Sequence, residues 1–235
     1  MSIVVALLAI FIGIAAWWLA TQRIMSKPWL EIGVVDTPPG VRPPTAKIGL
    51  GVFLAVAGVL FALSISAYSM RLQAADWWPL PAPRLLWFNT GLLILASAAL
   101  EWTKTQSHHA DLDGVRFGLV AAGVFTFAFV IGQLAVWREL AGEGYFLASN
   151  PANAFFYLMT GLHGLHVLGG LVALVRVTLR AFGADQVGGD RSRLRLGLEL
   201  CAIYWHFLLV VWLVLFALIA GWAGDVFEIC RQVLS

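Results

Sequence analysis

The chain has 235 residues, of which 60% are hydrophobic and 12% charged, and its formal net charge is +2. Ordinary soluble domains carry about 25% charged residues, and a soluble monomer of this size could not hide so much apolar surface in one core. The composition therefore indicates a membrane protein. Two cysteines exclude a disulfide scaffold, the apolar content excludes intrinsic disorder, and the small net charge without a run of Lys or Arg argues against a nucleic-acid partner.

Charge-free apolar stretches recur along the chain at the length that a bilayer requires, about 20 helical residues. Six such stretches cover residues 1–20, 48–70, 85–100, 117–137, 152–175 and 200–224. The third is the shortest, and we expect it to continue to Trp102 or Thr103 by including Glu101 near its end. Alternating strands typical of a membrane barrel are not found. The sequence thus predicts an all-α, polytopic transmembrane bundle of six spans.

A proline-rich segment separates the first span from the other five. Residues 28–46 contain five prolines and favour an extended connector. The first span has its basic residues, Arg23 and Lys27, after its apolar run, which favours a retained anchor over a signal peptide. We expect four segments: a transmembrane anchor over 1–27, a cytoplasmic linker over 28–46, a five-helix core over 47–225 and a periplasmic tail over 226–235.

The basic residues predict the orientation. If the N-terminus is outside, the inner loops 21–47, 101–116 and 176–199 carry eleven of the 15 Lys and Arg residues, and the outer segments carry four. This asymmetry obeys the positive-inside rule, so we expect both chain ends on the outer side. Tryptophans near span ends are typical of interfacial anchors; they are Trp17, Trp18, Trp77, Trp78, Trp102, Trp137 and Trp222.

Ionisable residues within the spans are rare and usually mark a specific role. His163 and His166 are three residues apart on the fifth span, so they share one helix face. Glu199 and His206 are seven apart on the sixth and also share a face. The helical rise places His166 and His206 at similar depths, roughly 12–14 Å from the inner side, where adjacent spans could bring them together.

Two interpretations of the three histidines are open. Two imidazoles on facing helices suit a haem, and three suit copper or iron. Alternatively, the rings form interhelical hydrogen bonds, each contributing about 1 kcal/mol. We favour hydrogen bonding, because the second to fourth spans contain no further histidine and no carboxylate lies at the bilayer centre.

Basic residues gather at the inner ends of the fifth and sixth spans. Glu199 lies at the same boundary and could meet Arg176 or Arg180. Anionic lipid headgroups are a second candidate partner for these cations, although ordinary orientation charge explains them equally well. The candidate headgroup ligands are Arg176, Arg180, Arg191 and Arg193.

Two motifs on the last two spans resemble subunit III of cytochrome c oxidase. The first is Phe156-Tyr157-x-x-Thr160-Gly161-Leu162-His163-Gly164-Leu165-His166-Val167, followed by Gly170. The second is Glu199, then Tyr204-Trp205-His206-Phe207, Val211-Trp212-Leu213 and Phe216. Weaker matches upstream are Lys47, Gly49, Phe53-Leu54, Phe61, Asn89-Thr90, Ser97 and Gln133. The resemblance covers residues 47–222.

This resemblance implies a non-catalytic accessory subunit of a bacterial aa3-type haem-copper oxidase in the inner membrane. Such a subunit holds no haem or copper itself, since the metals lie in subunits I and II. It packs on subunit I, binds phospholipids and supports proton uptake. The residues expected to act as structural contacts between helices are His163, His166, Glu199, His206, Trp205 and Gln133.

The sequence departs from the family pattern at four positions. Carboxylates usual in the family are replaced by Ala57, Val136 and Leu209, and a usual histidine by Arg195. Other functions remain open at this point: a subunit of a quinol oxidase, an accessory protein of nitric oxide reductase, a membrane cytochrome that uses His166 and His206, or a stand-alone transporter.

Overall fold

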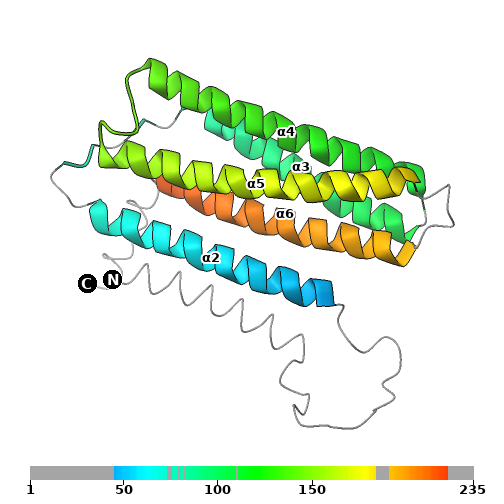
Figure 1. Ribbon diagram of the computed structural model, residues 1–235. Helices are drawn as coiled ribbons and strands as arrows, with labels where there is room; N and C mark the ends of the chain where they lie inside the picture. Colours follow the sequence, from blue (N-terminus) through cyan, green and yellow to red (C-terminus); the bar gives the residue numbers. More distant parts are fainter. Residues whose placement is uncertain are drawn as a thin grey trace, which may run out of the picture. The chain divides into compact units, whose positions relative to one another are not determined.

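The computed structural model describes residues 45–72, 76–78, 80–81, 83–109, 111–183 and 191–221. Within these residues every regular element is an α-helix, and five helices are long and apolar enough to cross a membrane (Figure 1). The prediction of an all-α transmembrane protein is confirmed. The anchor expected over 1–27 lies outside the described residues, as do nearly all of the linker and the whole C-terminal tail, so a sixth span stays a prediction.

The helices are longer than the charge-free stretches that predicted them. They are α2 (Thr45–Arg71), α3 (Leu85–His108), α4 (Leu112–Gly142), α5 (Pro151–Gly183) and α6 (Arg191–Ile219). The 31 residues of α4 and 33 of α5 rise about 46 and 50 Å, against a hydrocarbon core of about 30 Å. Helical hydrogen bonding therefore continues into the headgroup regions, where long basic side chains reach water.

The third predicted span shows this most clearly. Its expected end was Trp102 or Thr103, whereas α3 continues to His108. The additional turns contain Lys104, whose ammonium forms an ion pair with Glu101 at 2.8 Å. Charged residues indicate where the chain leaves the hydrocarbon, but the helix can continue beyond that point.

The chain divides into two compact units, residues 1–67 and 68–235. In the first unit the structure describes most of α2. Its buried residues are Ala57, Gly58, Phe61 and Ile65, which lie on one face at helical spacing.

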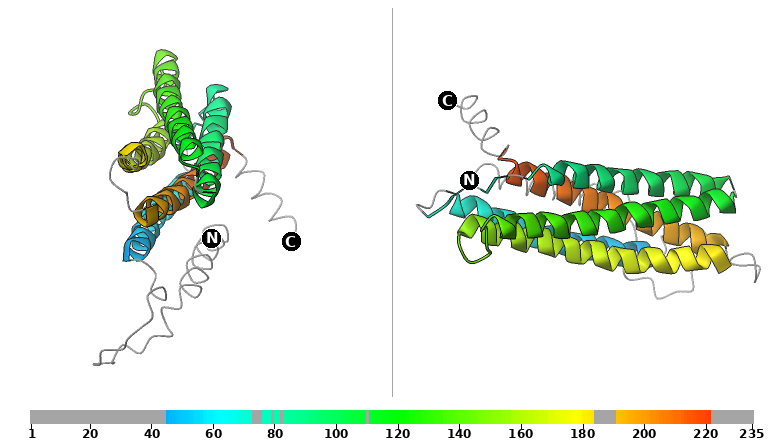
Figure 2. Two further views of the ribbon diagram at one scale, coloured as in Figure 1. Left: turned by 90° about the vertical axis from the view of Figure 1, so that its right-hand side faces the viewer. Right: turned by 90° about the horizontal axis from the view of Figure 1, so that it is seen from above.

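In the second unit, four helices form a closed ring. The α4 helix packs against α3 and α5, and α6 also packs against α3 and α5, as the end-on view in Figure 2 shows. The largest side chains in the centre, Trp205, Trp212 and Phe129, are almost completely buried. This four-helix bundle positions all the candidate residues on α5 and α6.

Local sequence signals determine several helix ends. The Asp111 carboxylate accepts a hydrogen bond from Gly114 N at 3.1 Å and caps α4. The α5 helix begins at Pro151, and the side chain of the preceding Asn150 accepts from Ala152 N at 3.0 Å. Past the end of α4 the chain turns at Gly144, whose φ of +89° is accessible to glycine at little cost.

Glycines allow close approach between neighbouring helices of the bundle. A Cβ atom on Gly118 would overlap Thr103 of α3, and one on Gly132 would overlap Asn89. On α5, a Cβ atom on Gly170 would lie 2.7 Å from Tyr204 Cε1. Small residues of this kind are typical of membrane helix interfaces, where packing replaces the hydrophobic driving force.

The contact at Gly170 can be tested with a matched pair of variants. We expect Gly170→Ala to lower the free energy of unfolding by about 1–3 kcal/mol, because the Tyr204 ring is held by a hydrogen bond and cannot easily move aside. Gly169→Ala, one residue away, meets nothing within 4 Å and should be neutral or slightly stabilising. The measurement is unfolding in mixed micelles with increasing SDS. Equal stability of the two variants would contradict the close packing.

Candidate functional site

His163 lies at the centre of the bundle. Its ring is fully buried, with centroids 5.8 Å from Phe129 and 5.0 Å from Trp212. Its Nε2 lies 3.1 Å from the carbonyl oxygen of Leu208 on α6. Because a carbonyl oxygen only accepts hydrogen bonds, Nε2 carries the hydrogen and donates it. His163 therefore joins α5 to α6 through the backbone, and its Nε2 lone pair is not available to a metal.

His166 and His206 form hydrogen bonds within their own helices. His166 Nδ1 donates to Leu162 O at 2.8 Å, and His206 Nδ1 donates to Ala202 O. The His166 side chain is half-buried and that of His206 is exposed. These bonds do not join α5 to α6, so the predicted interhelical role of both rings stays a prediction.

Tyr204 forms a second connection between α5 and α6. Its hydroxyl donates to the carbonyl oxygen of His166 at 2.8 Å. The Tyr204 side chain approaches α5 at Gly170, where no Cβ obstructs it. Tyr204 and Gly170 both belong to the motifs described above, but the sequence alone did not indicate that they meet.

Trp205 connects α6 to α4 across the core. Its indole Nε1 donates to Thr126 Oγ1 at 3.0 Å, and Thr126 Oγ1 donates to Ala122 O at 2.7 Å. The threonine hydroxyl thus accepts one hydrogen bond and donates another, so neither buried group lacks a partner. Sequence reasoning identified Trp205 and missed Thr126, because a lone threonine within a span carries no distinctive signal.

The same arrangement occurs twice more in the bundle. Trp212 Nε1 donates to Thr90 Oγ1 at 2.9 Å and connects α6 to α3. Trp137 Nε1 donates to Thr160 Oγ1 at 3.1 Å and connects α4 to α5. Thr90 and Thr160 each donate to the carbonyl four residues earlier in their own helix. The indole N–H groups of Trp137, Trp205 and Trp212 therefore each have a threonine hydroxyl as acceptor.

Gln133 forms the polar contact between α3 and α4. Asn89 Nδ2 donates to Gln133 Oε1 at 3.4 Å, and both amides are buried. Asn89 Oδ1 and Gln133 Nε2 have no hydrogen-bond partner among the described residues. This contact is long for a hydrogen bond, and the close approach at Gly132 is what brings Asn89 near α4.

The charged candidates lie in the C-terminal part of α5 and the N-terminal part of α6. Glu199 is half-buried, and Arg176, Arg180 and Arg193 are exposed. The Arg191 side chain lies outside what the structure describes. The pairing of Glu199 with Arg176 or Arg180 therefore stays a prediction, as does lipid binding by these arginines.

The described helices do not bring together the side chains that a metal site requires. In the part of the chain that the structure describes, no group of three or more His, Cys, Asp or Glu residues could hold a metal ion. The three imidazoles each use one ring nitrogen to donate to a carbonyl. The hydrogen bonds of His163 and of the three tryptophans instead join neighbouring helices and hold each at one rotation.

The sequence comparisons identify the family. Residues 47–224 match the family model of cytochrome c oxidase subunit III. The probable cytochrome c oxidase subunit 3 of Mycobacterium tuberculosis strain H37Rv is 31% identical over 183 residues, which cover 76% of this chain and 88% of that protein. The chain belongs to the cytochrome c oxidase subunit III family.

Further relatives show the same coverage of this chain. The cytochrome c oxidase subunit 3 of Thermostichus vulcanus is 29% identical over 182 residues, covering 76% of this chain and 88% of the relative. That of Synechocystis sp. strain PCC 6803 is 31% identical over 186 residues, or 76% of both chains. With its apolar helices, the chain is an integral membrane protein and a subunit of a haem-copper oxidase complex.

The three positions at which this subunit III lacks the family's usual carboxylates differ in how deeply they are buried. Val136 on α4 is fully buried and Ala57 on α2 is nearly so, whereas Leu209 on α6 is half-buried. A valine at position 136 fills its site with apolar contacts and carries no proton to exchange.

A double-mutant cycle tests the indole–threonine bond. We expect Trp212→Phe and Thr90→Val to be coupled by about 0.6 kcal/mol and by no more than about 1.7 kcal/mol, the average and the maximum found for hydrogen bonds between membrane helices. The measurement is the free energy of unfolding of both single variants and the double variant. Thr178→Val is the control, because its hydroxyl bonds to Leu174 O within α5, and it should show no coupling to Trp212→Phe. Additive effects of Trp212→Phe and Thr90→Val would show that the bond contributes nothing.

Proposed function

We propose that this chain is the non-catalytic accessory subunit of a bacterial aa3-type cytochrome c oxidase, where it packs directly on subunit I, with subunit II in the same complex. On this proposal haem and copper reside in subunits I and II, and this chain holds neither. Family membership supports it, as do imidazoles that donate to backbone carbonyls at separate points. Its contribution to O2 reduction is to stabilise the complex.

One exposed stripe of α6 carries the proposed contact with subunit I. Ile203, His206, Val210 and Leu213 are exposed, and their spacing of three and four residues places them on one helix face. His206 lies about 10 Å along the helix from Glu199, which places it within the hydrocarbon. An imidazole at that depth is costly against lipid tails and favourable against a polar group of another protein helix. A helix of subunit I with such a group is the proposed neighbour.

The remaining topology follows from the charge asymmetry. We infer that the chain is a multi-pass protein of the bacterial inner membrane with both termini periplasmic. Its segments are an anchor over 1–27, a linker over 28–46, a five-helix core over 47–225 and a tail over 226–235. The exposed inner cations Arg176, Arg180 and Arg193, with Arg191, are proposed to contact phospholipid headgroups on the cytoplasmic side.

Support of proton uptake is proposed to be indirect. Ala57, Val136 and Leu209 cannot bind or release a proton, and they stand where the family usually has carboxylates. The subunit therefore acts on proton uptake by holding subunit I and its surrounding lipids in place. His163, His166, Glu199, His206, Trp205 and Gln133 are proposed as structural residues of this scaffold.

His206→Leu tests the proposed contact. We expect the variant to retain at least fivefold less subunit I in mild detergent, because a buried hydrogen bond across the interface contributes about 1 kcal/mol or more. The subunit I that is retained should show an unchanged haem absorbance spectrum. The measurement is the ratio of subunit I to this chain after affinity purification.

Leu165→Ala, at an exposed position on α5, is the control and should retain subunit I normally. Undiminished subunit I with His206→Leu would place the contact elsewhere, on the α2 unit or another face. A Soret band in this chain purified alone would overturn the non-catalytic assignment.

A further inference from the structure

His206 is the polar member of an otherwise apolar stripe on α6. Among residues 200–216 of this helix, the exposed side chains are those of Ile203, His206, Val210 and Leu213. The three aliphatic side chains can meet lipid tails or another protein equally well. The imidazole carries two ring nitrogens, so it is the side chain of this stripe that specifies the chemistry of a neighbour.

A hydrogen bond within α6 decides which nitrogen of the His206 ring carries the hydrogen. Nδ1 bonds to the carbonyl oxygen of Ala202, and a carbonyl oxygen only accepts, so Nδ1 holds the hydrogen and donates it. At the proposed depth of His206 in the hydrocarbon, a neutral imidazole is far less costly than a charged one. A neutral ring has a single N–H. Its Nε2 therefore carries a lone pair, which accepts a hydrogen bond and cannot donate one.

His163 makes the opposite demand on its neighbouring helix. Its Nε2 donates to Leu208 O at 3.1 Å, so α6 supplies an acceptor there. At His206 the donated hydrogen stays within α6, and the neighbour has to supply the donor. A carbonyl or carboxylate oxygen placed against His206 Nε2 would leave two acceptors facing each other, which a buried interface disfavours.

Few kinds of donor are available on a transmembrane helix at this depth. Its backbone N–H groups are already bonded within the helix. A Lys or Arg side chain would bring a charge into the hydrocarbon. The remaining donors are neutral side chains that carry a hydroxyl, an indole or a carboxamide group. The bundle itself uses such donors between helices, since the Tyr204 hydroxyl donates to His166 O and the Trp205 indole to Thr126 Oγ1.

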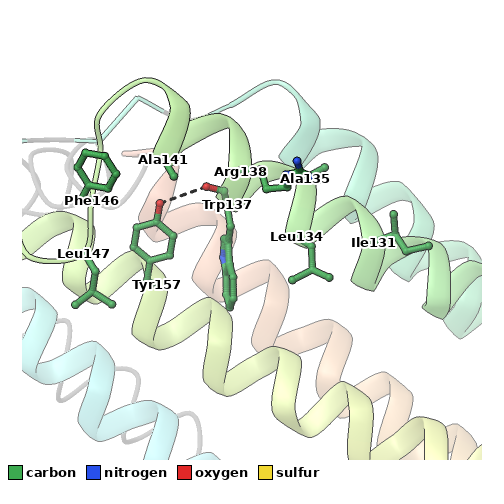
Figure 3. Close-up of a pocket in the computed structure, with 9 residues that line it drawn as sticks. All are labelled: Ile131, Leu134, Ala135, Trp137, Arg138, Ala141, Phe146, Leu147 and Tyr157. Carbon is green, nitrogen blue, oxygen red and sulfur yellow. Dashed lines mark hydrogen bonds between the residues drawn. The ribbon is translucent and has the colours of Figure 1, made fainter.

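The polar aromatic side chains of the apolar groove between α4 and α5 make no such demand. Trp137 and Tyr157 both line this groove (Figure 3). The Trp137 indole donates to Thr160 Oγ1, and the Tyr157 hydroxyl donates to Tyr145 O at 3.0 Å. These two side chains, unlike His206, therefore have their hydrogen-bond partners within the chain.

We propose that His206 Nε2 accepts a hydrogen bond from a neutral side-chain donor on a transmembrane helix of subunit I. The donor is a hydroxyl, an indole or a carboxamide group. Ile203, Val210 and Leu213 pack against the same helix and keep lipid away from the bond. This inference rests on the proposed contact with subunit I and specifies the chemistry of that contact.

A structure of the purified oxidase complex tests the assignment directly. Cryo-electron microscopy should place a Ser, Thr, Tyr, Trp, Asn or Gln side chain of subunit I within hydrogen-bond distance of His206 Nε2. A carboxylate, a carbonyl oxygen, a Lys or an Arg in that place would overturn the donor assignment and leave the contact with subunit I standing. Lipid facing Nε2, with subunit I packed on a different face, would overturn both.

Substitutions at position 206 test the same bond through the amount of subunit I that is retained in mild detergent. His206→Gln should retain at least half as much as the unaltered chain, because its amide oxygen can accept in place of Nε2. His206→Met should retain at least twofold more than His206→Leu. The Met and Leu side chains have similar volumes, but only the thioether accepts a hydrogen bond, and neither side chain donates one.

The outcomes separate this inference from the proposed function. Normal retention of subunit I with His206→Leu would mean that the contact itself is absent from this stripe, and both would fail. If His206→Leu loses subunit I while His206→Met retains no more than His206→Leu, the contact stands and the donor assignment fails. Graded retention, with Gln above Met and Met above Leu, is the result expected for a donor on subunit I.

Discussion

The four-helix bundle depends on burying the two indoles of α6 without leaving their N–H groups unsatisfied. In a membrane an unpaired donor costs several kcal/mol, and no water is at hand to satisfy it. Thr126 and Thr90 solve this problem, because each hydroxyl accepts from an indole and donates to its own helix. Trp205 and Trp212 are seven residues apart on α6, so this one helix is fixed against α4 and α3 at two heights. The rotation of α6 follows from these two bonds.

His163 belongs to the same polar core. Its ring packs on Trp212, and its Nε2 donates to a backbone carbonyl of α6. The imidazole thus holds α5 against α6, just as Trp212 holds α6 against α3. A residue that resembles a redox ligand in the sequence is, in the structure, a donor that joins two helices. This agrees with membership of the cytochrome c oxidase subunit III family, a non-catalytic part of the oxidase.

An exposed polar side chain on the described surface supports the proposed neighbour of the bundle. His206 lies on an exposed stripe of α6, and its proposed depth within the hydrocarbon would make a protein partner favourable. Arg138 lines an apolar groove between α4 and α5.

The sequence by itself determined the membrane environment, the helical class, five of the spans and the family, because apolar length and motif spacing are local properties of the chain. It also led to the prediction that His163, Trp205 and Gln133 are structural contacts between helices, a role that stays a prediction, although in the structure Trp205 Nε1 donates to Thr126 Oγ1 and His163 Nε2 to Leu208 O. It did not predict the α3 end at His108, because helical hydrogen bonding does not stop where charge begins. Only the tertiary structure decided that Trp137, expected as an interfacial anchor, bonds to Thr160. Periodicity tells which residues share a helix face, whereas the rotation of the neighbouring helix decides what that face meets.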